Sequence, residues 1–158
     1  MNKTAEHLVA MLKATGMTCA TAESCTGGGI GSAITGVPGS SEVYLGGVVS
    51  YSNQVKHEVL GVSSASLETF GAVSPQVAEE MALGARRLTR ADIAVSVTGI
   101  AGPGGGNAEK PVGLVWFGLA TADGVRSEKK LFMGDRASVR AQAVTHALGM
   151  LQIACMKP

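Results

Sequence analysis

Apolar residues recur at helical spacing in three long stretches of the chain. Residues 3–14 place them on one face ahead of Gly16, a residue type that commonly ends a helix. Ser74-Pro75 has the pattern of a helix start, with the serine as cap and the proline in the first turn. Asp135 can cap a third apolar stretch near the end of the chain. Three amphipathic helices are therefore expected.

Further segments have the length and the β-branched or apolar content of strands. The run at 92–97 is almost continuously apolar, which is typical of a strand covered on both faces. Ala122-Asp123-Gly124 is a hairpin turn signal between the last two strands. Shorter helices are expected at 30–35 and 53–60, the second capped by Asn53. The expected strands are 17–24, 43–51, 92–97, 112–120 and 125–132.

Strands that alternate with helices and end in a hairpin predict an α/β fold. The expected architecture is a three-layer α/β/α sandwich around a mostly parallel mixed sheet of about five or six strands. A length of 158 residues suits one compact domain. No linker, repeat or low-complexity tract divides the chain, so residues 1–158 are expected to form a single domain.

The charge balance narrows the class of partner. The 13 Lys and Arg residues stand against 12 Asp and Glu residues, which gives a formal net charge of +1. So small a charge provides little attraction to a polyanion, and nucleic acid is not the expected partner. No stretch approaches ~18 consecutive apolar residues, so no membrane span is expected either.

The cysteines do not indicate a stabilising disulfide or metal site. Cys19, Cys25 and Cys155 lack C-x-x-C spacing, which argues against a disulfide framework and a zinc site. No set of His, Cys, Asp and Glu residues has a convincing metal-ligand spacing, so neither a metal nor another cofactor is expected. Charges spread through the first residues exclude the apolar core of a signal peptide. These observations predict a cytoplasmic protein with reduced thiols.

Glycine is unusually abundant, at 22 of 158 residues, about twice the usual ~7%. Ligands of open α/β sheets bind beyond the carboxyl ends of the strands, where the loops 24–29, 50–56 and 98–106 are expected. The two glycine-rich loops, 24–29 and 98–106, could cradle an anion with backbone N–H groups, or could simply be turns. Arg136 and Arg140, four residues apart on one helix face, could clamp a phosphate or be solvated. The candidate binding residues in the glycine-rich loops are Thr26, Gly27, Gly28, Thr98, Gly99 and Gly102.

The candidate nucleophiles follow no familiar protease pattern. A G-x-S-x-G elbow is absent and the histidines are dispersed, so a Ser-His-Asp triad is not expected. A Ser-Lys pair can be built from Ser41, on a turn, and Lys56, in the first turn of a helix whose dipole disfavours its charged form. Tyr51 ends the strand between them. The same spacing also fits a capping serine, a solvated lysine and a half-buried tyrosine.

A cysteine offers a second nucleophile. Cys25 lies beside a glycine turn at an expected helix start, where its pKa would be depressed, and His57 could assist it. A small buried cysteine with no chemical role is the alternative interpretation.

Several short motifs occur together in an order that identifies a family. They are TAESCTGG at 21–28, GSS at 39–41, YSN at 51–53 with a lysine at 56, GAVS at 71–74, GIAGPGGG at 99–106, KPVG at 110–113 and GDR at 134–136. With these motifs the chain closely resembles the CinA C-terminal domain family over about residues 5–155.

The resemblance implies an activity. Characterised members of this family are nicotinamide-nucleotide amidases, which hydrolyse the carboxamide of nicotinamide mononucleotide to nicotinate mononucleotide and ammonia in pyridine nucleotide salvage. It also implies a metal-independent reaction in which Ser41 is the nucleophile, Lys56 its general base and Tyr51 an orienting or proton-shuttling residue. The residues implied to line the substrate site are Thr26, Gly27, Thr98 and the loop from Gly99, with Arg136 or Arg140 at the phosphate.

Two other functions remain open at this point, a Cys25-based hydrolase and a non-catalytic nucleotide-binding or interaction domain. A homodimer or higher homo-oligomer is expected because two-fold assemblies are common. Six aromatic rings could stack on a pyridine: Tyr44, Tyr51, Phe70, Trp116, Phe117 and Phe132.

Overall fold

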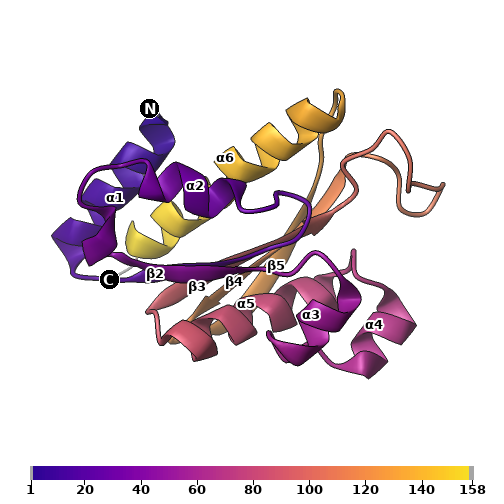
Figure 1. Ribbon diagram of the computed structural model, residues 1–158, viewed down its shortest axis with the longest axis horizontal. Helices are drawn as coiled ribbons and strands as arrows, with labels where there is room; N and C mark the ends of the chain where they lie inside the picture. Colours follow the sequence, from indigo (N-terminus) through magenta and orange to yellow (C-terminus); the bar gives the residue numbers. More distant parts are fainter. Residues whose placement is uncertain (1, 157–158) are drawn as a thin grey trace.

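The computed structural model describes residues 2–156, which form a five-stranded sheet with helices on both faces (Figure 1). The strands are β1 (Cys19–Glu23), β2 (Tyr44–Val49), β3 (Ile93–Gly99), β4 (Leu114–Thr121) and β5 (Gly124–Leu131). They lie in the order β2-β1-β3-β4-β5. β1 pairs in parallel with β2 and β3, whereas β4 is antiparallel to both of its neighbours. The predicted mixed sheet is confirmed.

The helices divide into two layers. They are α1 (Lys3–Thr15), α2 (Gly29–Thr35), α3 (Asn53–Glu58), α4 (Ser64–Phe70), α5 (Pro75–Thr89) and α6 (Arg136–Met156), with a short 3-10 helix at Ser40–Glu42. Figure 1 shows α1, α2 and α6 above the sheet and α3, α4 and α5 below it. The predicted three-layer α/β/α sandwich is confirmed.

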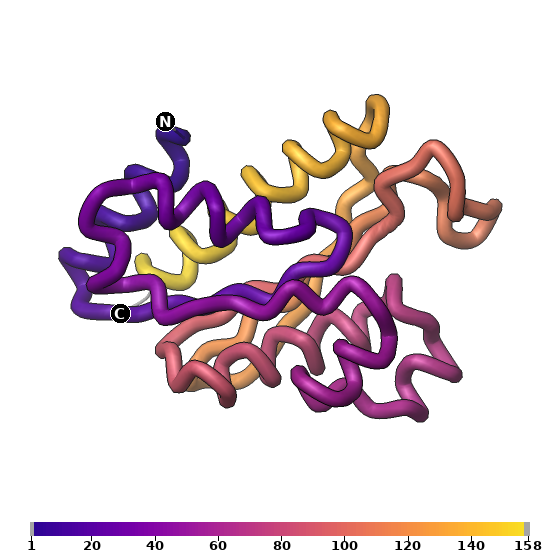
Figure 2. Tube along the Cα trace, in the orientation of Figure 1, coloured from indigo at the N-terminus to yellow at the C-terminus, as the bar shows by residue number. Residues whose placement is uncertain are grey.

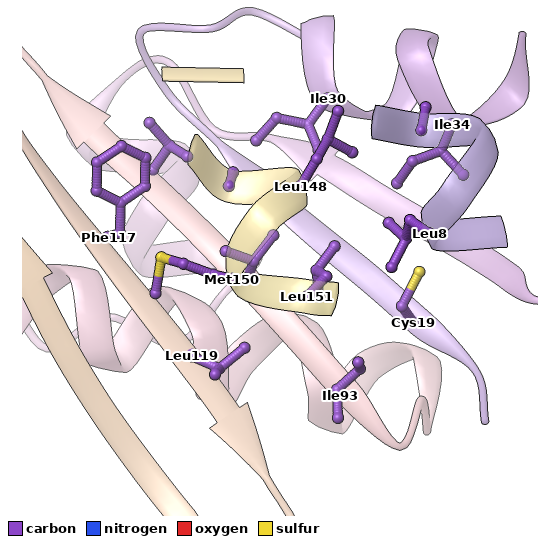
Figure 3. Packing of buried hydrophobic residues seen from close by; sticks show 14 of the residues in the cluster. Leu8, Cys19, Ile30, Ile34, Ile93, Phe117, Leu119, Leu148, Met150 and Leu151 are labelled. Carbon is purple, nitrogen blue, oxygen red and sulfur yellow. The ribbon is translucent and has the colours of Figure 1, made fainter. Parts of the chain in front are cut away.

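The larger core lies between the sheet and the layer of α1, α2 and α6 (Figure 3). Leu8 of α1, Ile34 of α2 and Leu151 of α6 are buried against strand residues that include Ile93 and Phe117. This packing accounts for the apolar face that the sequence places on each of these helices. β3 is covered on both faces, as its continuous apolar run predicts.

The connections bring two loops together at one edge of the sheet. β2 lies on one side of β1 and β3 on the other, so the strand order switches between β1 and β3. The loops that follow β1 and β3 therefore lie next to each other at the carboxyl edge, which is where open α/β sheets bind ligands. Figure 2 shows that the chain between β3 and β4 projects beyond this edge.

Some local details differ from the sequence predictions. The cap of α3 is Ser52, whose hydroxyl accepts a hydrogen bond from the Val55 N–H, and not Asn53. α3 ends at Glu58, two residues before the predicted end. α4 was not predicted, because its short sequence offers no buried residue and so no clear apolar period. Among residues 2–156, no helix is long and apolar enough to cross a membrane.

Candidate active site

Ser24 stands at the carboxyl edge of the sheet, directly after the central strand β1. Its N–H donates to the Val97 carbonyl of β3, 3.0 Å away, and its carbonyl accepts from the Gly27 N–H. The chain turns there and enters α2. A strand, a tight turn and a helix are the arrangement that presents a nucleophilic serine in many α/β hydrolases. Ser24 is 8% exposed, at the wall of a cavity.

The side chain of Lys56, in α3, extends to the Ser24 hydroxyl. Its ammonium nitrogen Nζ lies 2.9 Å from the Ser24 hydroxyl, 2.7 Å from the Ser50 carbonyl and 3.2 Å from the Tyr51 carbonyl. The side chain is 1% exposed, and it is among the largest fully buried side chains of the protein. A buried lysine without a carboxylate partner is uncommon, and it often marks a functional site.

Burial lowers the pKa of Lys56 to about 8, because the charged form loses its hydration; the neighbouring Cys25 opposes the shift. Burial, and not the helix dipole expected from sequence, is therefore the main cause. In its neutral form the amine has two hydrogens and one lone pair. The two carbonyls can only accept, so they take both hydrogens, and the lone pair is left to face the Ser24 hydroxyl.

The structure does not bring Ser41 to Lys56, which corrects the expected pair. Ser41 is exposed in the 3-10 helix that precedes β2, whereas Lys56 follows the other end of β2. The six residues of β2 separate them, a distance of about 20 Å at ~3.3 Å per residue. The sequence predicts Ser41 as the nucleophile because a turn can expose a hydroxyl. The signal that favours Ser24 is its place after a central strand at the switch in strand order.

Tyr51 contributes through its backbone and its ring. Its carbonyl accepts from Lys56, as described, and its hydroxyl accepts from Nη2 of Arg136 at 3.3 Å. The side chain is 65% exposed, at the rim of the cavity. Tyr51 therefore orients Lys56 through the main chain and connects the rim to α6.

The cavity beside Ser24 and Lys56 has a volume of about 280 Å³. Gly99, the last residue of β3, and the loop after it, including Gly102, form much of its wall. Substrate binding by these glycines stays a prediction. Thr98 also lines it, and its hydroxyl donates to the Ala72 carbonyl at 2.9 Å, which ties β3 to the segment that closes the opposite wall. The glycine-rich loop thus lies beside Ser24 and Lys56, and Ile100 and Ala101 are its lining residues that carry a side chain beyond the α carbon.

Thr26, Gly27 and Gly28 do not line this cavity, which corrects a second expectation. The N-terminus of α2 already holds an anion of the protein itself, the buried carboxylate of Glu23. Glu23 accepts from the Thr26 hydroxyl at 2.6 Å, from the Ile30 N–H at 2.9 Å and from the Gly31 N–H at 3.0 Å. These bonds occupy the donors that a phosphate would need.

Arg136 and Arg140 line a second cavity of about 520 Å³ that adjoins the first and shares Ala101 and Arg136 with it. Nη1 of Arg136 donates to the Gly102 carbonyl at 2.8 Å. Arg140 donates to the Cys25 carbonyl at 3.0 Å and to the Thr26 carbonyl at 3.2 Å. Arg140 therefore braces the turn that carries Ser24, while Arg136 stands between the two cavities.

The alternative pair of Cys25 and His57 is not assembled. Burial raises the pKa of the Cys25 thiol to about 11, so the thiol is protonated at neutral pH. Nδ1 of His57 lies 2.7 Å from the Val62 carbonyl, and the ring lines a cavity between α3 and α4. Within residues 2–156 no group of three or more His, Cys, Asp and Glu side chains is placed to hold a metal ion.

Comparison with known proteins identifies the relatives of this chain. The family model of the CinA C-terminal domain matches residues 1–155. Nicotinamide-nucleotide amidohydrolase PncC of Enterobacter agglomerans is 58% identical over 140 residues, which are 88% of this chain and 85% of that protein. The protein of the same name from Escherichia coli K12 is 50% identical, with 92% of this chain and 89% of that protein covered.

The similarity extends to longer relatives and to solved structures. A putative competence-damage inducible protein of Caldanaerobacter subterraneus is 48% identical over 93% of this chain, which spans 36% of that protein. The crystal structure of competence/damage inducible protein CihA from Agrobacterium tumefaciens has a TM-score of 0.94 and 45% identity, covering 98% of this chain and 94% of that one. A CinA superfamily structure from Escherichia coli has a TM-score of 0.91 and 37% identity, covering 98% of this chain and 88% of that one.

Proposed function

The chain belongs to the CinA C-terminal domain family, and on that premise we propose that it hydrolyses the carboxamide of nicotinamide mononucleotide to nicotinate mononucleotide and ammonia, with Ser24 as nucleophile and Lys56 as its base. The observation that carries the mechanism is the 2.9 Å contact between the Lys56 amine and the Ser24 hydroxyl at the wall of a cavity. The relatives named as nicotinamide-nucleotide amidohydrolases support the substrate.

The first half of the reaction forms an acyl-enzyme. Neutral Lys56 takes the proton of the Ser24 hydroxyl as its oxygen attacks the carboxamide carbon. Charge then develops on the carboxamide oxygen, which requires nearby N–H donors. We assign this role to the backbone N–H groups of Cys25, next to the nucleophile, and of Gly104 and Gly105, since all three residues line the cavity.

Loss of ammonia completes the first half and forms the acyl-enzyme, and the second half hydrolyses this ester and restores the enzyme. Lys56, now an ammonium, returns its proton to the departing nitrogen, and ammonia leaves. A water molecule then gives a proton to Lys56 and attacks the ester carbon of the acyl-enzyme. The proton returns to Ser24 as nicotinate mononucleotide is released. The Ser50 and Tyr51 carbonyls hold the amine in place through both halves.

The two adjoining cavities suggest how the substrate lies. The smaller holds the catalytic pair and suits the pyridine carboxamide, and the larger, with two guanidinium groups, suits the ribosyl phosphate. Arg136 uses only one N–H on the Gly102 carbonyl and one on Tyr51, so it keeps donors for the substrate. Arg136 is therefore the arginine proposed to meet the phosphate.

The substrate is tested by ammonia release. Purified protein is incubated with nicotinamide mononucleotide, nicotinamide riboside or nicotinamide, and ammonia and the acid product are measured. We expect turnover of the mononucleotide and at least about tenfold lower kcat/KM for the riboside, which lacks the phosphate. Binding of the mononucleotide without release of ammonia over hours would instead establish a non-catalytic binding domain.

We further propose a homo-oligomer that acts in the cytoplasm. Leu45 and Val49 of the edge strand β2 are 45% and 52% exposed, which supports burial of this edge against a second copy. Cys19, Cys25 and Cys155 are buried free thiols, which supports a reducing compartment. Light scattering tests the oligomeric state, since a purely monomeric mass at working concentration would contradict the proposed homo-oligomer.

A further inference from the structure

A further cavity of about 580 Å³ lies on the α5 side of the sheet, separate from the catalytic one. The end of α4 and the start of α5 form one wall, and β4, β5 and the loop at Lys110 form the others. Its only shared lining residue with the catalytic cavity is Val73. The volume is within the range of small-molecule sites.

The walls combine an aromatic surface with positive charge. Trp116 of β4 lines the cavity, and the Lys129 ammonium of β5 lies 5.6 Å from its ring centroid. The Lys110 ammonium also lines it and donates to the Phe70 carbonyl, which leaves two of its hydrogens for another partner. Glu109 is the one carboxylate among the lining residues. The balance of charge in the walls therefore favours an anion.

An unsatisfied acceptor also belongs to this cavity. Gln76, in the first turn of α5, is a lining residue, and its Oε1 is buried with no hydrogen-bond partner among residues 2–156. Buried polar atoms are nearly always hydrogen-bonded, so an orphaned acceptor beside a cavity indicates a missing donor. Rotation of the Gln76 amide toward the cavity would let an amino or amide N–H of a ligand supply it.

We propose that this cavity binds a mononucleotide whose base carries an amino or amide group, at a site distinct from the catalytic one. The base contacts Trp116, its N–H donates to Gln76, and the phosphate lies between Lys110 and Lys129. The chemistry is shared by adenine and nicotinamide mononucleotides, and the test separates the two. Binding at this site does not depend on the proposed hydrolysis, whereas its regulatory role rests on that proposed function.

The position of the site gives it a regulatory role. Val73 lines both cavities, and its neighbour Ala72 lines the catalytic one and accepts the hydrogen bond from Thr98. An occupant of the further cavity therefore contacts the segment that closes the catalytic wall. Binding there changes the KM of the enzyme for its substrate.

Trp116 is the only tryptophan in the chain, so its fluorescence reports on this cavity directly. The intact protein is titrated with AMP, and binding is measured by fluorescence and by calorimetry. Adenosine, which lacks the anion, and inorganic phosphate, which lacks the ring, are titrated in parallel. We expect saturable binding of AMP, with at least about tenfold weaker binding of either fragment. Nicotinamide mononucleotide is titrated against the Ser24→Ala variant, which does not consume it.

Charge-removing variants assign the site. We expect the Lys110→Ala/Lys129→Ala double variant to bind AMP about tenfold more weakly or worse. The Lys3→Ala/Lys130→Ala variant removes the same charge away from the cavity and is expected to bind as the wild type does. Absence of AMP binding, equal loss in both double variants, or loss of the signal in Arg136→Ala alone would overturn the site. An unchanged KM at saturating AMP would overturn its regulatory role.

Discussion

The amine of Lys56 and the hydroxyl of Ser24 lie 2.9 Å apart, although 32 positions separate them in the chain. β1 carries Ser24 to the carboxyl edge of the sheet, and the helix after the neighbouring strand β2 carries Lys56 to the same edge. Parallel pairing of β1 with β2 therefore creates the pair. The pair needs no third side chain, because two backbone carbonyls orient the lysine.

Replacement of the serines separates the two candidate nucleophiles. We expect Ser24→Ala to lower kcat for ammonia release by about 10³-fold or more, because among residues 2–156 no other hydroxyl forms a hydrogen bond with the Lys56 amine. Ser41→Ala, at the far end of β2, is expected to retain nearly wild-type turnover. The measurement is initial-rate ammonia release, with circular dichroism to confirm folding. Loss of activity in Ser41→Ala with retention in Ser24→Ala would reverse the assignment.

The rate should follow the titration of Lys56. Because its pKa is lowered to about 8 and the neutral amine is the active form, kcat/KM is expected to rise with pH. The rise should be about tenfold per pH unit well below 8 and should level off above it. Lys56→Arg cannot lose its proton and is expected to be inactive across the range. A flat profile between pH 6.5 and 9.5 would show that Lys56 is not the base.

Arg136 should matter for the phosphate more than for the chemistry. We expect Arg136→Ala to raise the KM for nicotinamide mononucleotide by about 10–100-fold with a smaller change in kcat, because a charge-assisted contact is lost. For nicotinamide riboside the same variant should behave nearly as the wild type does. A loss of equal size for both substrates would mean that Arg136 acts through Gly102 and Tyr51 alone.

Glu23 should hold the turn beside Ser24 in place. Its carboxylate accepts three hydrogen bonds while 2% exposed. An amide in its place has a single acceptor oxygen and turns N–H donors toward backbone N–H groups, so we expect Glu23→Gln to lower the free energy of unfolding by about 1–3 kcal/mol. Urea denaturation measures it. Thr26→Ser keeps the hydroxyl and is the control, with little change expected.

Replacement of two helical glycines by alanine should change the stability of the protein in opposite directions. A methyl group at Gly84 of α5 would overlap the Leu60 carbonyl, so Gly84→Ala is expected to destabilise the protein by about 1–3 kcal/mol. Apart from its chain neighbours and the backbone of its own helix turn, no atom of residues 2–156 lies within 4 Å of the corresponding position at Gly149 of α6. Gly149→Ala should therefore stabilise by about 0.5–1 kcal/mol through helix propensity. Thermal unfolding of both variants measures these changes in stability. Equal shifts of Tm in the two variants would contradict the close packing at Gly84.

The sequence by itself determined the layers and the edge at which the site lies. Alternating apolar strands and amphipathic helices can bury their apolar faces only in an α/β/α sandwich, and the glycine loops after β1 and β3 mark the carboxyl edge. Local signals such as the Ser74 and Asp135 caps depend on neighbours in the chain, and both are present in the structure. The ordered motifs also identified the family.

The tertiary structure alone decided which residues meet. Sequence spacing did not identify Ser24, which follows a strand, whereas Ser41 follows a turn that can expose a hydroxyl, and only the strand order places Ser24 beside Lys56. Nor could it show that Glu23 already fills the N-terminus of α2. The lowered pKa of Lys56 likewise depends on burial among residues distant in the chain. Contacts between distant residues and the loss of hydration on burial arise only when the chain is packed, so local sequence patterns do not reveal them.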